Sequence, residues 1–135
     1  MTRINIVPTN ELTDQHLIAE YREITMIPAS LYRTLNSKVG LLKHKISVRY
    51  TLNTGHVYFF YNKGKYLHKR YKQIVNEMKL RGFKPDVNRT FPIDVFKDNG
   101  LYDDWIPTLE DYKVIRERID EKIALKPEWY RKTNP

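Results

Sequence analysis

The stretch from residue 64 to residue 82 constrains the fold most, because its apolar residues recur with the period of an α-helix. Leu67, Tyr71, Ile74 and Met78 fall on one face, and lysines occupy the others. A glycine at position 82 and a proline at 85 follow the last apolar residue. These residues predict one long amphipathic helix that ends near residue 82.

Two further stretches carry helix signals. Thr13 is a plausible N-cap for a helix whose inward stripe is Leu17, Tyr21 and Ile24. Pro28 would interrupt or reshape that helix, so its length beyond residue 25 stays open.

The third helix is predicted to open at Thr108, which forms a weak capping box with Asp111, and to close at Pro127. Its apolar face repeats at helical spacing and contains Tyr112, Ile115, Ile119 and Ile123.

Two segments between the helices are harder to assign. Residues 57–61 read VYFFY, which favours a strand. This strand could pair with residues 49–51 as a two-stranded ribbon, or the segment could be a packed aromatic loop.

Residues 84–106 contain two prolines and a glycine, yet five apolar residues in them need burial. We expect a long ordered connection there.

Charge is distributed unevenly along the chain. The formal net charge is +8, and residues 33–84 carry thirteen Lys or Arg and one acid, whereas residues 85–135 carry nine basic and eleven acidic residues. Such a polycationic stretch attracts phosphate backbones, with an affinity that falls as salt rises. A membrane surface is the other polyanion to consider, but no apolar run approaches the roughly 20 residues that a membrane span needs. We expect a soluble, intracellular protein.

Several enzyme classes are disfavoured by what the sequence lacks. There is no cysteine, which excludes disulfides, thiolate zinc sites and a thiol nucleophile and fits a reducing compartment. His16, His44, His56 and His68 show no metal-ligand spacing. No glycine-rich phosphate loop or GxSxG elbow appears. We therefore expect chemistry without a metal or other cofactor.

The amino terminus reads Met1-Thr2-Arg3. If Met1 is removed, Thr2 offers a free α-amine with an ordinary pKa of about 7.7–8.0, so a useful fraction is uncharged near neutral pH. A lysine, with a pKa near 10.4, would first need strong desolvation. The terminal amine is therefore a candidate nucleophile.

One face of the first predicted helix gathers polar residues. His16 and Glu23 lie seven positions apart, as do Gln15 and Arg22, so the four occupy adjacent strips. The ordinary interpretation is a solvated helix surface. A site interpretation gains support from a carboxylate that stands beside Arg22 and close to the Arg3-bearing terminus.

Six segments are similar in register to one known family. They are MTRIN (1–5), LTDQHLIAEYRE (12–23), GHVYFFYNK (55–63), LHKR (67–70), RGF (81–83) and RIDEKIALKPEWY (118–130). In this combination the chain resembles the phage endonuclease V type of pyrimidine-dimer DNA glycosylase. The resemblance implies an all-α fold: one compact domain, residues 1–135, of three main helices with long ordered loops and the amino terminus between helices. It also implies that VYFFY is a packed, non-helical stretch.

The resemblance implies a DNA repair activity. Thr2 would supply the α-amine that attacks the sugar of a cyclobutane pyrimidine dimer, expels the base and forms an imine, after which β-elimination cleaves the strand. Glu23 would stabilise the cationic sugar and imine and help to move protons. The implied partner is duplex DNA with ultraviolet lesions or abasic sites, bound by a monomer that can be virus-encoded and act in a host cell.

Matching positions also imply DNA contacts. They are Arg3, Gln15, His16 and Arg22 around the lesion, Arg118 and Lys122 at phosphates, and Trp129 and Tyr130 beside the bases. Each charge could instead be merely solvated, and Trp129 could lie in the core.

Two departures from the family pattern stand out. The tail after Tyr130 reads RKTNP and lacks further tyrosines, and position 26 is Met26 where an arginine is expected. The first weakens the expectation of dimer preference, and the second removes one phosphate contact. Two alternatives stay open: the same chemistry on another damaged base, and a basic DNA-binding protein without enzymatic activity.

Overall fold

Helix α1 (Asp14–Glu23) begins where the N-cap signal predicts. Thr13 precedes it in an extended conformation, and its hydroxyl accepts a hydrogen bond from the backbone amide of His16 at 3.1 Å. One of the amide groups that the first turn leaves without a helical partner is thereby satisfied. The structure is a computed structural model that describes residues 2–135.

The other two predicted helices are also confirmed. Helix α6 (Leu109–Leu125) opens with the complete capping box, in which Thr108 and Asp111 each accept a hydrogen bond from the other's backbone amide. Helix α4 (Gly64–Leu80) is followed by Gly82 in the left-handed conformation, with a φ of 86°. A glycine adopts this conformation without the steric cost that a side chain would bring.

Helix α2 (Met26–Leu35) was not predicted. The chain turns after Glu23 and resumes a helix in which Pro28 is the third residue. The first four backbone amides of a helix have no intrahelical acceptor, so a proline there costs no hydrogen bond. Pro28 therefore reshapes the chain between α1 and α2 without preventing a second helix.

The expectation for the VYFFY segment was wrong in both of its forms. Residues His56–Phe59 form the short helix α3, so the segment is neither a strand nor a non-helical stretch. Gly55 precedes α3 with a φ of 89°, which turns the chain into the helix. Within residues 2–135 the structure has no β-strand, and Lys63 and Tyr102 form an isolated bridge.

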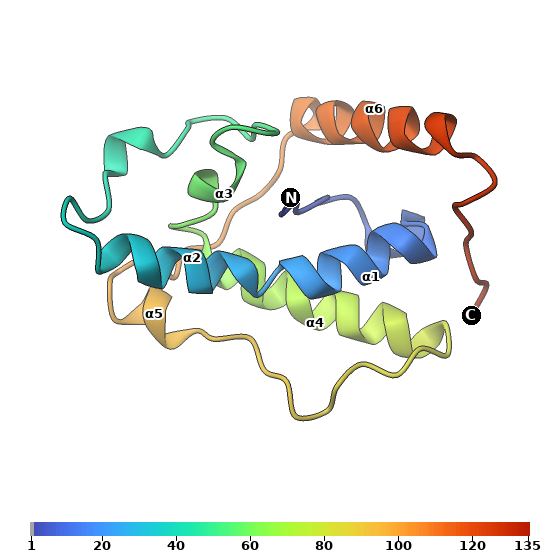
Figure 1. Cartoon of the computed structure of the whole chain (residues 1–135), viewed down its shortest axis with the longest axis horizontal. Coiled ribbons are helices and arrows are strands. Elements are labelled where there is room, and N and C mark those ends of the chain that lie inside the picture. The colour runs from blue at the N-terminus through green and yellow to red at the C-terminus, as the bar shows by residue number, and fades with distance from the viewer. Residues whose placement is uncertain (1) are drawn as a thin grey trace.

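The helices form layers around the amino-terminal segment (Figure 1). Helices α1 and α2 follow each other through the middle of the molecule, α4 packs against α1, and α5 (Asp94–Lys97) packs against α2. Helix α6 lies on the other side of residues 2–7, which run between it and α1 (Figure 1). Two short 3-10 turns, η1 (Thr9–Glu11) and η2 (Lys43–Lys45), complete the fold.

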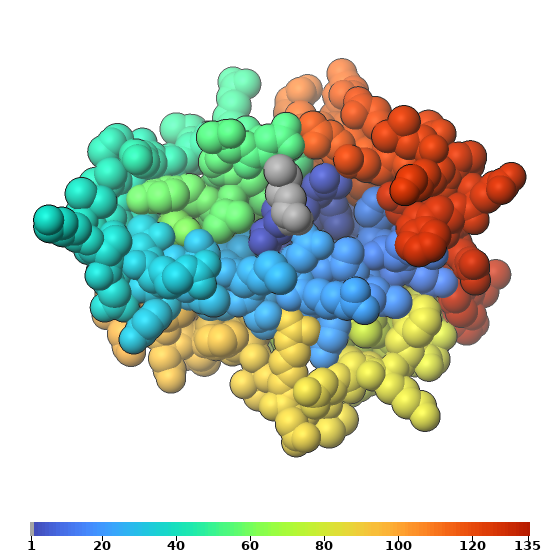
Figure 2. All heavy atoms as spheres, in the orientation of Figure 1, coloured from blue at the N-terminus to red at the C-terminus, as the bar shows by residue number. Residues whose placement is uncertain are grey.

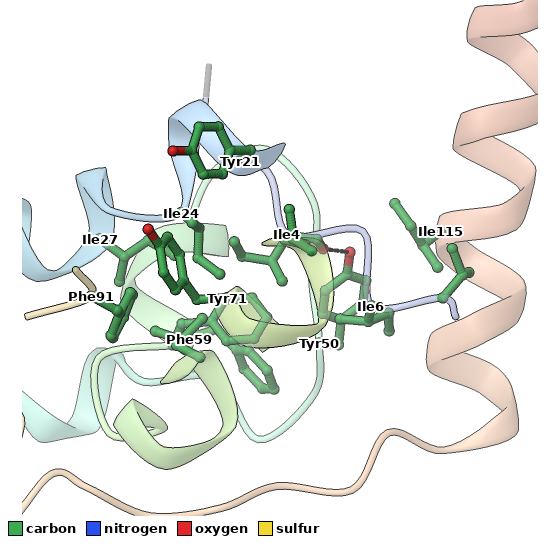
Figure 3. Packing of buried hydrophobic residues seen from close by; sticks show 14 of the residues in the cluster. Ile4, Ile6, Tyr21, Ile24, Ile27, Tyr50, Phe59, Tyr71, Phe91 and Ile115 are labelled. Atoms are coloured by element: carbon green, nitrogen blue, oxygen red, sulfur yellow. Dashed lines mark hydrogen bonds between the residues drawn. The ribbon is translucent and has the colours of Figure 1, made fainter. Parts of the chain in front are cut away.

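The core includes the amino-terminal segment itself. Ile4 is fully buried among Ile24, Ile27 and Phe59, and Ile115 of α6 points toward it from the opposite side (Figure 3). Burying side chains of this size contributes roughly 1.5–3 kcal/mol each. The segment that carries the amino terminus is therefore fixed by packing rather than free in solvent.

The long connection between α4 and α6 is ordered, as predicted. Phe91, Phe96 and Leu101 are buried in the core. Gly64 allows Phe96 to approach α4, because a Cβ atom at this position would lie 2.4 Å from the Phe96 ring.

No helix within residues 2–135 combines the length and the apolar character needed to span a bilayer.

Candidate active site

Carboxylates from α1 hold the backbone next to Thr2. The amide of Arg3 donates to Glu23 Oε1 at 2.9 Å, and the amide of Asn5 donates to Glu20 Oε1 at 3.0 Å. The two glutamates lie three residues apart on α1, so they face the same extended segment. Side chains thus satisfy backbone groups for which no neighbouring strand exists.

The amide between them is bound by a buried histidine. Ile4 donates to His56 Nε2 at 2.8 Å, and the carbonyl of Ile4 accepts from the Tyr50 hydroxyl at 2.7 Å (Figure 3). His56 Nδ1 lies 2.8 Å from the carbonyl oxygen of Thr51, which can only accept. His56 is therefore neutral, with its proton on Nδ1, and burial lowers its pKa.

The extended segment ends in a strained turn. The amide of Val7 donates to the carbonyl of Asn5 across Ile6, whose φ is +48°. A β-branched residue rarely adopts this region, and the surrounding structure must hold it there. This turn directs residues 2–5 back along α1.

A buried ion pair fixes the glutamate beneath the segment. Arg70 of α4 donates to both oxygens of Glu20, at 2.6 and 3.0 Å, and to the carbonyl of Val7. The side chains of Arg70 and Glu20 are 2% and 0% exposed. Such a fork-shaped pair fixes the carboxylate in one orientation.

Arg3, Asn5, Glu20 and Glu23 border a surface cavity of about 210 Å³ between α1 and α6. The side chains that line it combine two cations, two carboxylates and two aromatic rings. They are Arg3, Asn5, His16, Ala19, Glu20, Glu23, Lys122 and Tyr130. The Oδ1 atom of Asn5 is buried without a hydrogen-bond partner in the described residues.

Two groups that line the cavity, Glu23 and His16, have shifted pKa values. Burial raises the pKa of Glu23, although the hydrogen bond from the Arg3 amide opposes the shift. Burial and the nearby Arg3 charge lower the pKa of His16. A carboxyl group whose pKa moves toward neutral is suited to proton transfer, and a cavity with perturbed groups is a candidate catalytic site.

The structure brings part of the predicted set together. Arg3, His16, Glu23, Lys122 and Tyr130 all line the cavity. The ring of Tyr130 stacks on His16, with centroids 4.7 Å apart and an interplanar angle of 8°.

Gln15, another predicted DNA contact, bonds to the carboxyl-terminal tail. Its side chain donates to the carbonyl of Trp129 at 2.7 Å and accepts from the amide of Arg131 at 2.9 Å. It thereby fastens the carboxyl-terminal tail to α1, next to the cavity. Trp129 is 59% exposed, which rules out a place in the core.

Two predicted arginines lie outside the cavity. Arg22 is exposed on α1, next to Glu23. Arg118 donates to Asn53 Oδ1 at 3.2 Å and lies 3.6 Å from the carboxylate of Glu121. In the space-filling view the amino-terminal residues, in dark blue, reach the surface between the segments of α1 and α6 (Figure 2).

Thr2 is partly exposed at the end of the held segment, and its hydroxyl lies 3.5 Å from the sulfur of Met26. The prediction that Met1 is removed concerns a residue outside those that the structure describes. The backbone nitrogen of Thr2 is one residue away from the amide that Glu23 binds.

Sequence reasoning missed Asn5, which lines the cavity, and the residues that hold the segment, namely Glu20, Tyr50, His56 and Arg70. Glu20 had a detectable signal, because it lies four residues after His16 and three before Glu23 on α1. The contact of His56 with Ile4 joins residues 52 positions apart and has no local signature.

Comparison with protein families gives one finding. Residues 1–91 match the family model described as pyrimidine dimer DNA glycosylase. The matched stretch covers the amino-terminal segment, α1 and α4, together with the residues that bind the backbone beside Thr2.

Proposed function

This chain belongs to the pyrimidine dimer DNA glycosylase family, a family of DNA repair enzymes, and we propose that it attacks the lesion with the α-amine of Thr2. One observation carries this proposal. The carboxylate of Glu23 binds the amide of Arg3 at 2.9 Å, beside Thr2, in a cavity that also presents the cations of Arg3 and Lys122. A carboxylate and two cations beside the segment that begins at Thr2 support this assignment.

The first step replaces the base. The uncharged amine of Thr2, after loss of Met1, attacks C1′ of the 5′ nucleotide of a cyclobutane dimer. The bond from C1′ to the base breaks, and its electron pair leaves with the base, which takes the proton that the attacking nitrogen gives up. The sugar ring then opens as its oxygen takes a proton from solvent, and a protonated imine forms between C1′ and the nitrogen.

The second step cleaves the strand. The cationic imine withdraws electrons and makes the proton on C2′ acidic. Removal of that proton forms a double bond between C2′ and C3′, and the 3′ phosphate leaves with the C3′–O electron pair. Water then releases the sugar from Thr2 and restores the amine.

Glu23 serves both steps in this proposal. Its ionised form stabilises the cationic sugar and the imine at short range in a partly desolvated cavity. Its raised pKa, caused by burial, also brings it closer to the pH at which it can accept and return a proton. The bond to the Arg3 amide holds it in place.

The remaining residues of the site would bind DNA. Arg3, His16 and Lys122 line the cavity. Arg3 and His16 would contact DNA around the lesion, and Lys122 would contact a phosphate. Arg22 and Gln15 would add contacts around the lesion, and Arg118 would add one at a phosphate. Trp129 and Tyr130 would offer aromatic rings for stacking, and Gln15 also binds the tail that carries them. A dimer already weakens stacking and pairing, so the duplex kinks there and a base opposite the lesion is extruded at lower cost than at an intact site.

Substrate preference is the part of the proposal that an assay decides directly. Duplexes that carry one cyclobutane thymine dimer, one oxidised base or no lesion are incubated with the protein, and strand cleavage is measured. We expect cleavage of the dimer-containing duplex alone. Faster cleavage of the oxidised-base duplex would assign the same chemistry to another substrate, and binding without any cleavage would leave a DNA-binding protein.

A further inference from the structure

Residues 131–133 of the carboxyl-terminal tail bind the first turn of α1. The amide of Asp14 donates to the carbonyl of Arg131 at 2.7 Å, which satisfies an amide that has no acceptor within the helix. The carboxylate of Asp14 accepts from the amide of Thr133 at 3.0 Å and from its hydroxyl at 2.6 Å. Hydrogen bonds to a carboxylate are stronger than those between neutral groups, so Thr133 is a firm point of attachment for the tail.

A buried arginine holds the Asp14 carboxylate in place. Arg81, the C-cap residue of α4, donates to Asp14 Oδ1 at 3.0 Å and to Glu77 Oε2 at 2.8 Å. Its side chain is fully buried. We call Asp14, Arg81 and Thr133 the tail clasp, because they connect an exposed end of the chain to the packed interior.

The tail clasp stands close in sequence to a ring of the candidate active site. Tyr130 stacks on His16, and both rings line the cavity between α1 and α6. Gln15 binds the carbonyl of Trp129 and the amide of Arg131, so the backbone is held on both sides of the stacked ring. The tail bonds thus determine where this ring lies.

Thr133 belongs to the part of the chain that departs from the family pattern. The tail after Tyr130 reads RKTNP and lacks the further tyrosines of that pattern. The stretch that the family model matches ends at residue 91, so it does not include the tail. The bonds of Thr133 to Asp14 are therefore a feature of this chain's own tail.

We infer that Thr133 is a positioning residue, which acts through Asp14 to hold the Tyr130 ring against His16 before DNA is bound. A ring that is already in place loses less conformational freedom when a ligand binds. DNA would therefore meet a preformed wall of the cavity. The inference rests on the proposed function only for the contact between Tyr130 and DNA.

Proton NMR of the protein alone tests where the ring lies. A ring current shifts protons above an aromatic face upfield, so the Cε1 proton of His16, assigned with a His16→Gln variant, reports the stack at a pH where His16 is neutral. Tyr130→Leu gives the resonance without the ring. We expect Thr133→Val to move the resonance most of the way to that value and Thr133→Ser, which keeps the hydroxyl, to leave it in place.

Thr90→Val is the matched control for this experiment, because Thr90 is exposed in the connection between α4 and α5, far along the chain from the tail. It should leave the His16 resonance unchanged. An unchanged resonance in Thr133→Val as well would overturn the inference.

Cleavage kinetics on the dimer-containing duplex test the consequence for binding. Thr133→Val is expected to raise KM about threefold to tenfold with little change in kcat, because the lost bond lies outside the cavity and helps to place a binding group. Thr133→Ser should restore KM. In a Tyr130→Leu background Thr133→Val should have no further effect, because Thr133 acts through that ring.

An equal rise of KM in both backgrounds would show that Thr133 does not act through Tyr130, and it would overturn the inference. If the unaltered protein cleaves no lesion, the proposed function fails, while the His16 resonance still decides whether Thr133 positions the ring.

Discussion

The backbone amide of Arg3 donates a hydrogen bond to the carboxylate of Glu23 at 2.9 Å. The carboxylate proposed to stabilise a cation is thus tied directly to the segment that carries the proposed nucleophile. A substitution that moves the Glu23 carboxylate also moves the segment that carries Thr2. A useful variant therefore removes the negative charge of Glu23 and keeps its hydrogen bond to the Arg3 amide.

Glu23→Gln separates the effect of the charge from that of the hydrogen bond. The glutamine carbonyl can still accept the Arg3 amide, so the segment keeps its place while the negative charge is lost. We predict that dimer cleavage falls by about a hundredfold or more. Affinity for a duplex with a tetrahydrofuran abasic analogue, which has no leaving base and cannot form an imine, should change little. Glu117→Gln, at an exposed position of α6, is the control. Full cleavage by Glu23→Gln would remove Glu23 from the mechanism.

The pH dependence of cleavage follows from the raised pKa of Glu23. The ionised form stabilises the cation, and it disappears as pH falls through a pKa that lies above the ordinary value of 4.5. We predict two steps of loss in kcat/KM as pH falls: one caused by protonation of the Thr2 amine, and a lower one caused by Glu23 that lies at a higher pH than an exposed glutamate would give. The lower step should be absent from the residual activity of Glu23→Gln, which keeps the step caused by the amine. An identical lower step in that variant would assign it to another group.

His56 makes stability depend on pH. Its pKa is lower in the folded protein than its ordinary 6.5, so below pH 6.5 the unfolded chain takes up a proton that the folded chain excludes. Stability is therefore lost as pH falls from about 6.5 toward the folded pKa. Denaturant unfolding at pH 7.5 and 5.5 should show a smaller loss for His56→Gln than for the unaltered protein. Equal losses would mean that His56 does not titrate in this way.

The buried ion pair of Glu20 and Arg70 is predicted to stabilise the folded protein. Arg70→Met would leave the buried Glu20 carboxylate without its partner and lower the free energy of unfolding by about 3–5 kcal/mol. Adding Glu20→Gln removes the unpaired charge, so the double variant should recover part of the loss in chemical denaturation. A double variant as unstable as the sum of both single variants would contradict the coupling.

Local chemistry explains which parts of the fold were predictable. Thr13 and Thr108 cap helices, as predicted. Each capping bond joins residues three positions apart, so a short stretch of sequence is enough to predict it. Helix α2 was missed because Pro28 reads as a helix breaker unless its place in the first turn is known. The strand propensity of VYFFY was overridden by packing, since Phe59 and Phe60 are buried in the core.

Some residues of the candidate site were likewise predictable from the sequence, and others were not. Thr2, Arg3, His16 and Glu23 follow from the resemblance and from helical spacing on α1. Their supports do not, because the hydrogen bonds of His56 to Ile4 and of Arg70 to Glu20 join residues 52 and 50 positions apart. Such contacts depend on how the helices pack, which no local pattern encodes.

Borohydride trapping tests the central claim most directly. The protein is mixed with a duplex that carries one cyclobutane thymine dimer, the imine is reduced, and the cross-linked peptide is identified by mass spectrometry. The proposed mechanism predicts a cross-link at the α-amine of Thr2 in the chain without Met1. Cleavage of the dimer without any cross-link, or a cross-link at a lysine, would contradict it.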